Sequence, residues 1–215
     1  FASEDEDVTS SLLQRRIVSA QKRIEGNNFD TRKNLLEYDD VMHAQRLAIY
    51  DTRQQILSNN EQVSEFCDES VENTIEKHIN QLLKGRKVDL QDIATFAWDT
   101  FKIDLNLNDL RVIAESKQKL SDYAKTRCLN AYKDKLANNV TNLVVEKLRV
   151  ITLNAIDNVW VQHLTNLEAL KDNVMLRSYA QIQPVAEYQI EALDLYRQMI
   201  ERLQLDITKS IMSEI

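Results

Sequence analysis

Histidines are the first candidates for metal binding in this sequence. There are three, His43, His78 and His163, and none stands in a Glu-x-x-His pair of the kind that di-iron helical bundles use. Asp39 and His43 are four residues apart, so on a helix they could share a metal ion or simply a hydrogen bond. Because no further ligand lies near them in the sequence, the hydrogen bond is the favoured interpretation. We therefore predict no metal site.

Motifs for nucleophilic catalysis and for phosphate binding are also missing from the sequence. Cys67 and Cys128 are isolated in apolar helical contexts without a histidine at useful spacing, which favours buried, reduced thiols and fits a reducing cytosol. A phosphate-binding loop needs glycines followed by Lys and then Ser or Thr, and neither Gly26 nor Gly85 has that context. We expect this chain alone neither to hydrolyse ATP nor to hold a cofactor.

The stretch NFDTRKNLLEYDDVMHAQR, residues 28–46, places a dense set of charges on what should be one helix. Exposed ion pairs contribute only about 0–1 kcal/mol each, so a solvated helix face is one interpretation. Polar contacts to another domain are the alternative. The charges by themselves favour the solvated face.

Composition indicates an all-α protein without a nucleic-acid or membrane-spanning role. The 215 residues include only two Gly and one Pro, which favours long uninterrupted helices. The net charge is −7 and no block of Lys or Arg stands alone, which argues against nucleic acid as the main partner. No apolar run approaches ~18 residues, and the acidic start does not resemble a signal peptide. Because the chain begins with Phe1, we expect it to be part of a longer protein.

Two helices are predicted in residues 1–59. The first is amphipathic and should end near Gly26, where GNN supplies a break. The second should run from about Asp30 to Asn59, reaching roughly 45 Å at 1.5 Å per residue. Its apolar stripe recurs every seven residues at Leu35, Met42, Ile49 and Ile56, with Tyr38 and Gln45 at the intervening positions.

Residues 60–138 predict a smaller helical subdomain. Two helices are separated by the loop KGRKVD, and KIDLNLN, residues 102–108, is interpreted as a connector because a lone strand would have no partner. Asn108 is then expected to cap one helix that extends to about Leu136.

The last third predicts a helical hairpin, with an apolar stripe on the outgoing arm that includes Leu143 and Val150 and one on the return arm that includes Leu193. The outgoing arm should run from Val140 to about Lys171, where Asp172 and Asn173 could terminate it, and the return arm should run from Glu187. Pro184 suits the first turn of the returning helix.

Two parts of this hairpin invite functional interpretation. Trp160 lies on the apolar stripe, where a buried indole would anchor the core with roughly 200 Å² of surface, and His163 follows one turn later. The tip carries Val174, Met175, Leu176 and Tyr179, which is apolar for an exposed loop, so it is either buried or in contact with something else.

Three motifs resemble the SecA preprotein-translocase ATPase family of bacteria, in its carboxy-terminal helical region. They are AQKRIEGNNFDTRKNLLEYDDVMHAQRLAIYDTRQQIL, IDNVWVQHL and LRSYAQIQPVAEY. The resemblance implies an all-α fold with a long scaffold helix, a two-helix finger and an inserted wing. It divides the chain into 1–27, the end of a motor-domain connection; 28–59, the long scaffold helix; 60–138, the helical wing; and 139–215, the finger with the second part of the scaffold.

The resemblance also implies roles for individual residues. Contacts to the absent nucleotide-binding and preprotein-binding domains are expected from charged residues of the scaffold helix: Arg32, Lys33, Glu37, Asp39, Asp40, Arg46 and Arg53. Contacts to polypeptide or to the channel are expected at the finger tip: Met175, Leu176, Arg177, Tyr179, Ala180 and Gln181. Tyr179 would grip the moving chain, since an aromatic ring can contact any sequence, and Trp160 with His163 would pack the hairpin.

This chain departs from the usual family pattern on the outgoing arm and at the tip. The departures are Leu167, Glu168, Lys171, Asn173, Ser178 and Ile182. The choice between a housekeeping and a divergent or accessory SecA therefore stays open.

The implied partners are the SecY channel complex, unfolded preprotein and the missing motor domains, which would bind ATP and Mg²⁺. An acidic phospholipid surface and a second copy of the chain are further partners that the resemblance allows. The implied location is the cytoplasm and the cytoplasmic face of the bacterial inner membrane. The competing hypothesis is a free-standing coiled-coil or helical-bundle adaptor without a motor, which the absence of a Walker A motif upstream would support.

Overall fold

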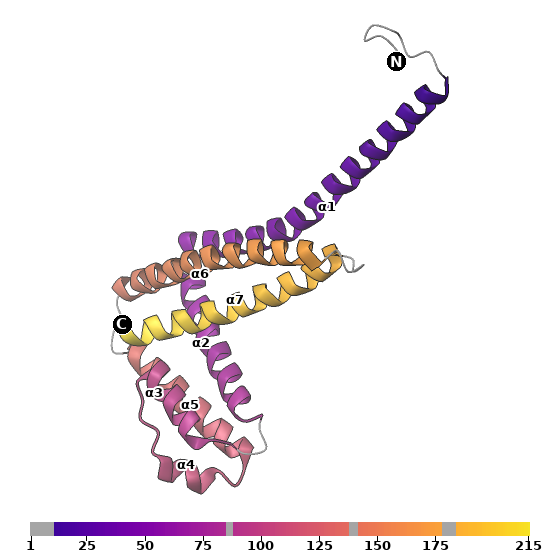
Figure 1. Cartoon of the computed structure of the whole chain (residues 1–215). Coiled ribbons are helices and arrows are strands. Elements are labelled where there is room, and N and C mark those ends of the chain that lie inside the picture. The colour runs from indigo at the N-terminus through magenta and orange to yellow at the C-terminus, as the bar shows by residue number, and fades with distance from the viewer. Residues whose placement is uncertain (1–10, 85–87, 138–141, 178–183) are drawn as a thin grey trace.

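The computed structural model describes residues 11–84, 88–137, 142–177 and 184–215, and the predicted all-α fold is confirmed. These residues form seven helices and no strand (Figure 1). The low content of Gly and Pro explains the length of the helices, because few positions interrupt the backbone hydrogen bonds. None of the described helices is long and apolar enough to span a bilayer.

Helix α1 (Ser11–Ser58) is continuous for 48 residues, so the predicted break near Gly26 is wrong. A single glycine costs a helix only about 1 kcal/mol relative to alanine, which the neighbouring turns can offset. The side chain of Thr31 also donates a hydrogen bond of 2.8 Å to the carbonyl of Asn27, inside the expected break. The first half of α1 projects from the body, whereas its second half lies along the hairpin (Figure 1). The proposed domain boundary at 27/28 therefore falls within a helix.

Helix α2 (Asn60–Leu82) follows α1 after one residue. Asn59 caps it, since its side-chain oxygen accepts a hydrogen bond of 2.9 Å from the backbone N–H of Glu61. The chain thereby changes direction sharply, and α2 runs away from α1 toward the smaller helices (Figure 1).

Three shorter helices follow α2: α3 (Leu90–Phe101), α4 (Leu107–Ile113) and α5 (Lys117–Ala137). Residues 102–106 connect α3 to α4 without forming a strand, as predicted. The single helix expected after Asn108 is wrong, because Asn106 is the cap and the chain breaks between α4 and α5. Helix α4 contacts both α3 and α5, and a helix continuous with α5 could not fold back onto it.

The hairpin consists of α6 (Asn142–Arg177) and α7 (Pro184–Glu214), which run side by side in Figure 1. Pro184 opens α7, as predicted from its fixed backbone angle. The expected end of α6 at Asp172 and Asn173 is wrong. Val174 is fully buried against α1 and α7 in a small apolar cluster, and continuing the helix is what places it there.

Two apolar clusters hold these helices together. The larger one joins the last part of α1, with Ile49 and Ile56, and helices α2, α3, α4 and α5 to the base and middle of the hairpin. The smaller one lies near the tip between α1 and both arms. Four residues of the predicted stripes are exposed instead: Leu35, Leu143, Val150 and Leu193. On α6 the buried face follows Leu148, Ile151 and Ala155, so Val150 lies on the opposite side.

Candidate functional site

The contact between the second half of α1 and both hairpin arms is the best-defined candidate site, and we call it the α1 seam. Helix α1 buries Tyr38, Gln45, Ile49 and Ile56 there. Their spacing of seven, four and seven residues is that of a coiled-coil seam, which keeps one helix face against its partners. The α1 seam thus joins the helix that carries the projecting half to both arms of the hairpin.

Aromatic contacts close the tip end of the α1 seam. The rings of Tyr38 on α1 and Tyr188 on α7 meet edge to face, with centroids 4.8 Å apart. Lys171 on α6 places its ammonium 5.7 Å from the centre of the Tyr38 ring and 4.0 Å from the carboxylate of Asp39. Burial raises the pKa of both tyrosines, so their hydroxyls stay neutral.

A buried polar node occupies the middle of the α1 seam and involves all three helices. Gln45 of α1 donates from its side-chain nitrogen to the carbonyl of Ala192 on α7, at 3.2 Å. A carbonyl can only accept, so the amide oxygen of Gln45 must face the other way, toward Nε2 of His163 on α6 at 2.8 Å. His163 therefore carries its proton on Nε2 and donates it to Gln45.

Aromatic side chains surround His163 on the hairpin side. Its ring lies 5.6 Å from that of Trp160 and 5.9 Å from that of Tyr196. Burial lowers the pKa of His163, because the charged imidazolium would lose its hydration there. Trp160 is 8% exposed and lies in the larger apolar cluster.

Arg53 and Asp157 form a second polar link across the seam, nearer its base. The guanidinium donates two hydrogen bonds to the carboxylate, at 3.0 and 3.4 Å. Both side chains are substantially exposed to solvent, which weakens their attraction. Tyr50, Trp160 and Val161 line the shallow groove around this pair.

The remaining charged residues that were proposed as interdomain contacts lie largely on the solvent side of α1. Arg32 donates to the carbonyl of Asn28 within the helix, and Lys33 lies 3.9 Å from Glu37 one turn away. Asp40 is exposed, and Arg46 is half-buried in a groove beside Lys171. Of the seven, Asp39 and Arg53 are the two that the structure places against charged groups of α6.

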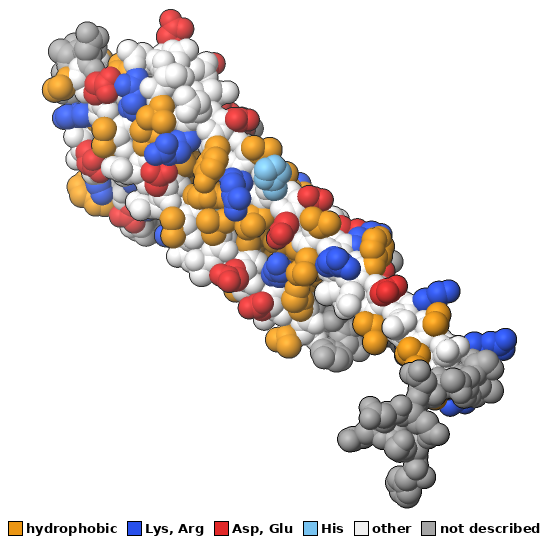
Figure 2. Space-filling model, turned by 90° about the horizontal axis from the view of Figure 1, so that it is seen from above, with side chains coloured by type: hydrophobic (Ala, Val, Ile, Leu, Met, Phe, Trp, Pro, Cys, Tyr) orange, Lys and Arg blue, Asp and Glu red, His pale blue; other side chains and the backbone are white. Residues whose placement is uncertain are grey.

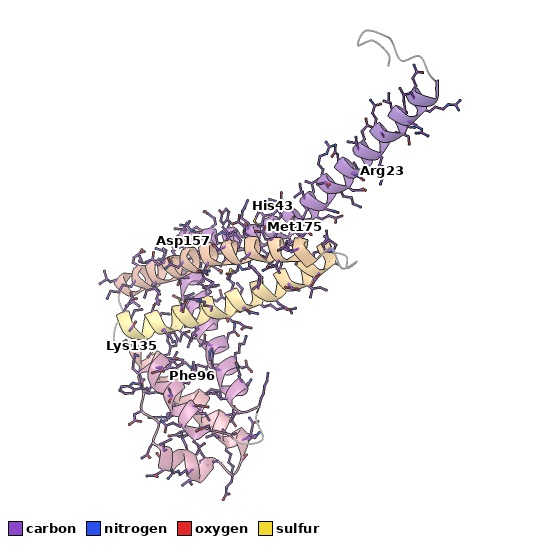
Figure 3. All side chains as sticks on the ribbon, in the orientation of Figure 1. Arg23, His43, Phe96, Lys135, Asp157 and Met175 are labelled. Carbon is purple, nitrogen blue, oxygen red and sulfur yellow. The ribbon has the colours of Figure 1, made fainter. Side chains whose placement is uncertain are left out.

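The predicted tip residues are described only in part. Met175 and Leu176 are exposed near the end of α6, and Arg177 is its last residue. Figure 3 shows Met175 close to the tip, with Asp157 farther along α6 and Arg23 on the projecting half of α1. Tyr179, Ala180 and Gln181 lie outside the described residues.

Arg149 is a structural contact that the sequence analysis did not identify. Its Nε donates to the carbonyl of Ile56 in the last turn of α1, at 3.0 Å, and its guanidinium also contacts Asn60 and Glu146. It thus satisfies a carbonyl that α1 leaves without a helical partner and fixes the corner between α1 and α2. The bridging role of Gln45 was missed too, although a polar residue within an apolar stripe was a usable signal.

Reactive groups are not gathered anywhere in the described parts of the chain. No set of three or more His, Cys, Asp or Glu side chains is close enough there to hold a metal ion. Burial raises the pKa of Cys67 to about 11 and that of Cys128 to about 12, so both thiols stay protonated.

A comparison with protein families agrees with this assembly of a long helix, a smaller helical subdomain and a hairpin. Residues 7–214 match the SecA wing and scaffold domain. The match covers nearly the whole chain and confirms the resemblance seen in the three motifs. The chain therefore belongs to the SecA wing and scaffold domain family, which is a component of SecA-type protein translocases.

Proposed function

We propose that this chain is the mechanical part of an ATP-driven preprotein motor, in which the hairpin passes force to unfolded polypeptide at the SecY channel. The observation that carries the proposal is the division of α1: one half packs on the hairpin and the other projects from the body (Figure 1). A helix of this kind can connect a distant domain to the hairpin without intermediate parts. Residues 1–27 would lead to the motor, and residues 28–59 would be the long scaffold helix. Residues 60–138 would be the wing, and residues 139–215 would form the finger and the second part of the scaffold.

The projecting half of α1 has the surface expected of a helix that packs on another domain. It exposes large apolar side chains: Leu13, Ile17, Val18, Ile24, Phe29, Leu35 and Leu36. Figure 2 shows hydrophobic side chains on this narrow part of the molecule as well as between charges of both signs on the broad body. Nucleotide-binding and preprotein-binding domains outside this chain would cover these side chains. Arg32, Lys33, Glu37 and Asp40 would then make polar contacts at the border of that interface.

The hairpin would act at its tip. Met175 and Leu176 are exposed there, so the described part of the tip already offers an apolar surface to a moving chain. Tyr179 would add an aromatic ring that can contact any sequence, with Arg177, Ala180 and Gln181 beside it. ATP and Mg²⁺ would bind in the motor domains. The protein would work at the cytoplasmic face of the inner membrane, where acidic phospholipids and a second copy are further partners.

Transport of a preprotein into membrane vesicles tests this proposal in the full-length protein. Tyr179→Ala should reduce transport while basal ATP turnover and the melting temperature stay unchanged, because the arms and the nucleotide site are not altered. Tyr179→Phe and Tyr179→Trp are the matched controls and should retain far more transport, since the ring rather than the hydroxyl makes the contact. Full transport by the Ala variant would refute the gripping role.

A further inference from the structure

The polar node is a contact of the α1 seam that is both buried and directional. The apolar contacts of Tyr38, Ile49 and Ile56 favour burial but specify no unique orientation. The ion pairs Arg53–Asp157 and Lys171–Asp39 lie at the solvent border, where attraction is weak. Gln45 and His163 are 9% and 2% exposed, so their hydrogen bond has little competition from water.

Gln45 is suited to orienting α1 because it uses both ends of its amide. One end accepts from the outgoing arm at His163, and the other donates to the returning arm at Ala192. The acceptor on α7 is a backbone carbonyl, and the fully buried Ala192 has a methyl side chain that lets α1 come close enough to reach it. A displacement or rotation of α1 relative to either arm would break one of the two bonds.

A second fixed point lies at the other end of the seam. Arg149 holds the carbonyl of Ile56 and the start of α2, about 16 Å from Gln45 along α1 at 1.5 Å per residue. One point would leave a helix free to swing, whereas two points define its direction. Beyond Tyr38, toward the N-terminus, α1 leaves the hairpin and projects (Figure 1). A small movement at the node would be magnified along that projecting half.

We propose that Gln45 and His163 are positioning residues that fix the direction of the projecting half of α1 relative to the hairpin tip. They select one orientation of α1 and are not needed for the stability of the fold. A buried polar pair can usually be replaced by apolar residues of similar volume without loss of stability, and its best-attested use is to select one arrangement among several. The consequence for transport rests on the proposed function above, whereas the orientation itself does not.

The test measures a distance between spin labels on Cys introduced at Gln21 and Gln189, in the full-length protein. Both positions are exposed and should lie about 30 Å apart along the helix axes. The native Cys67 and Cys128 are buried and protonated, so labelling at neutral pH should favour the introduced thiols. The variant is Gln45→Met with His163→Leu, which removes the pair but keeps apolar volume in the seam.

We expect the double variant to melt at or above the wild-type temperature while its distance distribution becomes at least twofold wider. A distribution as narrow as that of the wild type would overturn the proposal. A double variant that does not fold would overturn it too, because the pair would then be essential to stability. Arg53→Ala with Asp157→Ala is the matched control: it removes the exposed link between α1 and α6, and its distribution should stay narrow. If the distance distribution of this control widened equally, the orientation of α1 could not be assigned to Gln45 and His163.

Preprotein transport by the same double variant separates this inference from the proposed function. We expect transport to fall several-fold with basal ATP turnover retained. A wider distribution with normal transport would leave the positioning role standing and contradict the proposed use of the hairpin in transport. Unchanged distances with impaired transport would contradict the positioning role and leave the proposed use of the hairpin in transport standing.

Discussion

The hairpin packs on α1 and on α2 in different ways. The contact with α2, which we call the α2 seam, includes Cys67 and Thr74, and Val63, Val71, Ile75 and Ile79 of the same helix are almost completely buried within the larger apolar cluster. Helix α2 also contacts α5, so its seam is enclosed on several sides. Helix α2 buries seven side chains, whereas the described part of α1 buries four, one of which is Gln45.

The polar pairs of the two seams also differ, in the length of their side chains. Inside the α2 seam Cys67 contacts the hydroxyl of Thr152, and the hydroxyls of Thr74 and Thr208 form a hydrogen bond, both at 3.3 Å between short side chains. The longer pair Lys77–Glu201 lies at the exposed border of this seam. In the α1 seam the polar groups are long and reach across a wider space, as Gln45 and Arg53 do. We infer that α2 and the hairpin behave as one core, whereas α1 is attached to that core and is easier to displace.

The largest effect should come from Trp160→Ala, which tests whether the two seams share one core. Trp160 belongs to the larger cluster and also lines the groove that Tyr50 and Arg53 of α1 form. Removing its ring should lower the free energy of unfolding by about 3–5 kcal/mol, as for other large buried aromatics. Urea unfolding measures the loss, and a value under about 1 kcal/mol would show that the ring does not join the seams.

The same substitution in each seam should then separate them. Ile75 of α2 and Ile49 of α1 are almost equally buried, at 3% and 4% exposure. Replacement by alanine should cost about 2–5 kcal/mol, near the upper end for Ile75 and near the lower end for Ile49. The enclosed α2 seam cannot collapse around the cavity, whereas α1 can move toward the hairpin. If Ile49→Ala were the more damaging change in urea unfolding, the comparison would be wrong.

The sequence was sufficient where helical periodicity decides the outcome. The seven-residue stripe identified Ile49 and Ile56, with Tyr38 and Gln45 at the intervening positions, and all four are buried. Local stop signals were less reliable. Gly26 did not end α1, because a single glycine costs a helix only about 1 kcal/mol. Asp172 with Asn173 did not end α6, because the packing of Val174 outweighs a weak local preference.

The polar node could not be predicted from the sequence. His163 lies 118 positions from Gln45, and Ala192 lies 147 positions from it, so only the tertiary fold brings them together. The same holds for Arg149 and Ile56 at the base of α1. The roles proposed for Tyr179 and for the charged face of α1 remain predictions, because they concern contacts beyond these helices.

Acidification should weaken the α1 seam more than the α2 seam through His163. Burial lowers the pKa of His163 in the folded state, so near pH 6.5 the unfolded chain binds the proton more readily. Stability should therefore fall as the pH drops below about 6.5, until the folded-state pKa is passed. The hydroxyl pairs of the α2 seam do not titrate in this range. Urea unfolding at pH 7.0 and 5.5 measures the loss.

The control for this pH effect is His163→Leu, which cannot bind the proton. Other groups titrate alike in both proteins, so the difference in slope reports His163. The variant should lose less stability on acidification than the wild type does. An equal loss in the two proteins would assign the effect to other residues.

The smallest effect should come from Arg53→Ala, and its contrast with Arg149→Ala sharpens the picture of how α1 is attached. Arg53 belongs to α1 and meets Asp157 at the surface. Arg149 of α6 contacts α1 from outside: its side chain is 15% exposed and donates to a backbone carbonyl. Loss of the surface pair should cost about 0–1 kcal/mol and should shrink further in salt, since exposed charges are screened. Arg149→Ala should cost about 1–3 kcal/mol with little salt dependence, because the carbonyl of Ile56 loses its donor.

Urea unfolding of both variants at low and high salt makes the measurement, with Arg53→Ala/Asp157→Ala closing a double-mutant cycle. If Arg53→Ala were the costlier change, α1 would be held along its surface rather than at its base and at the node.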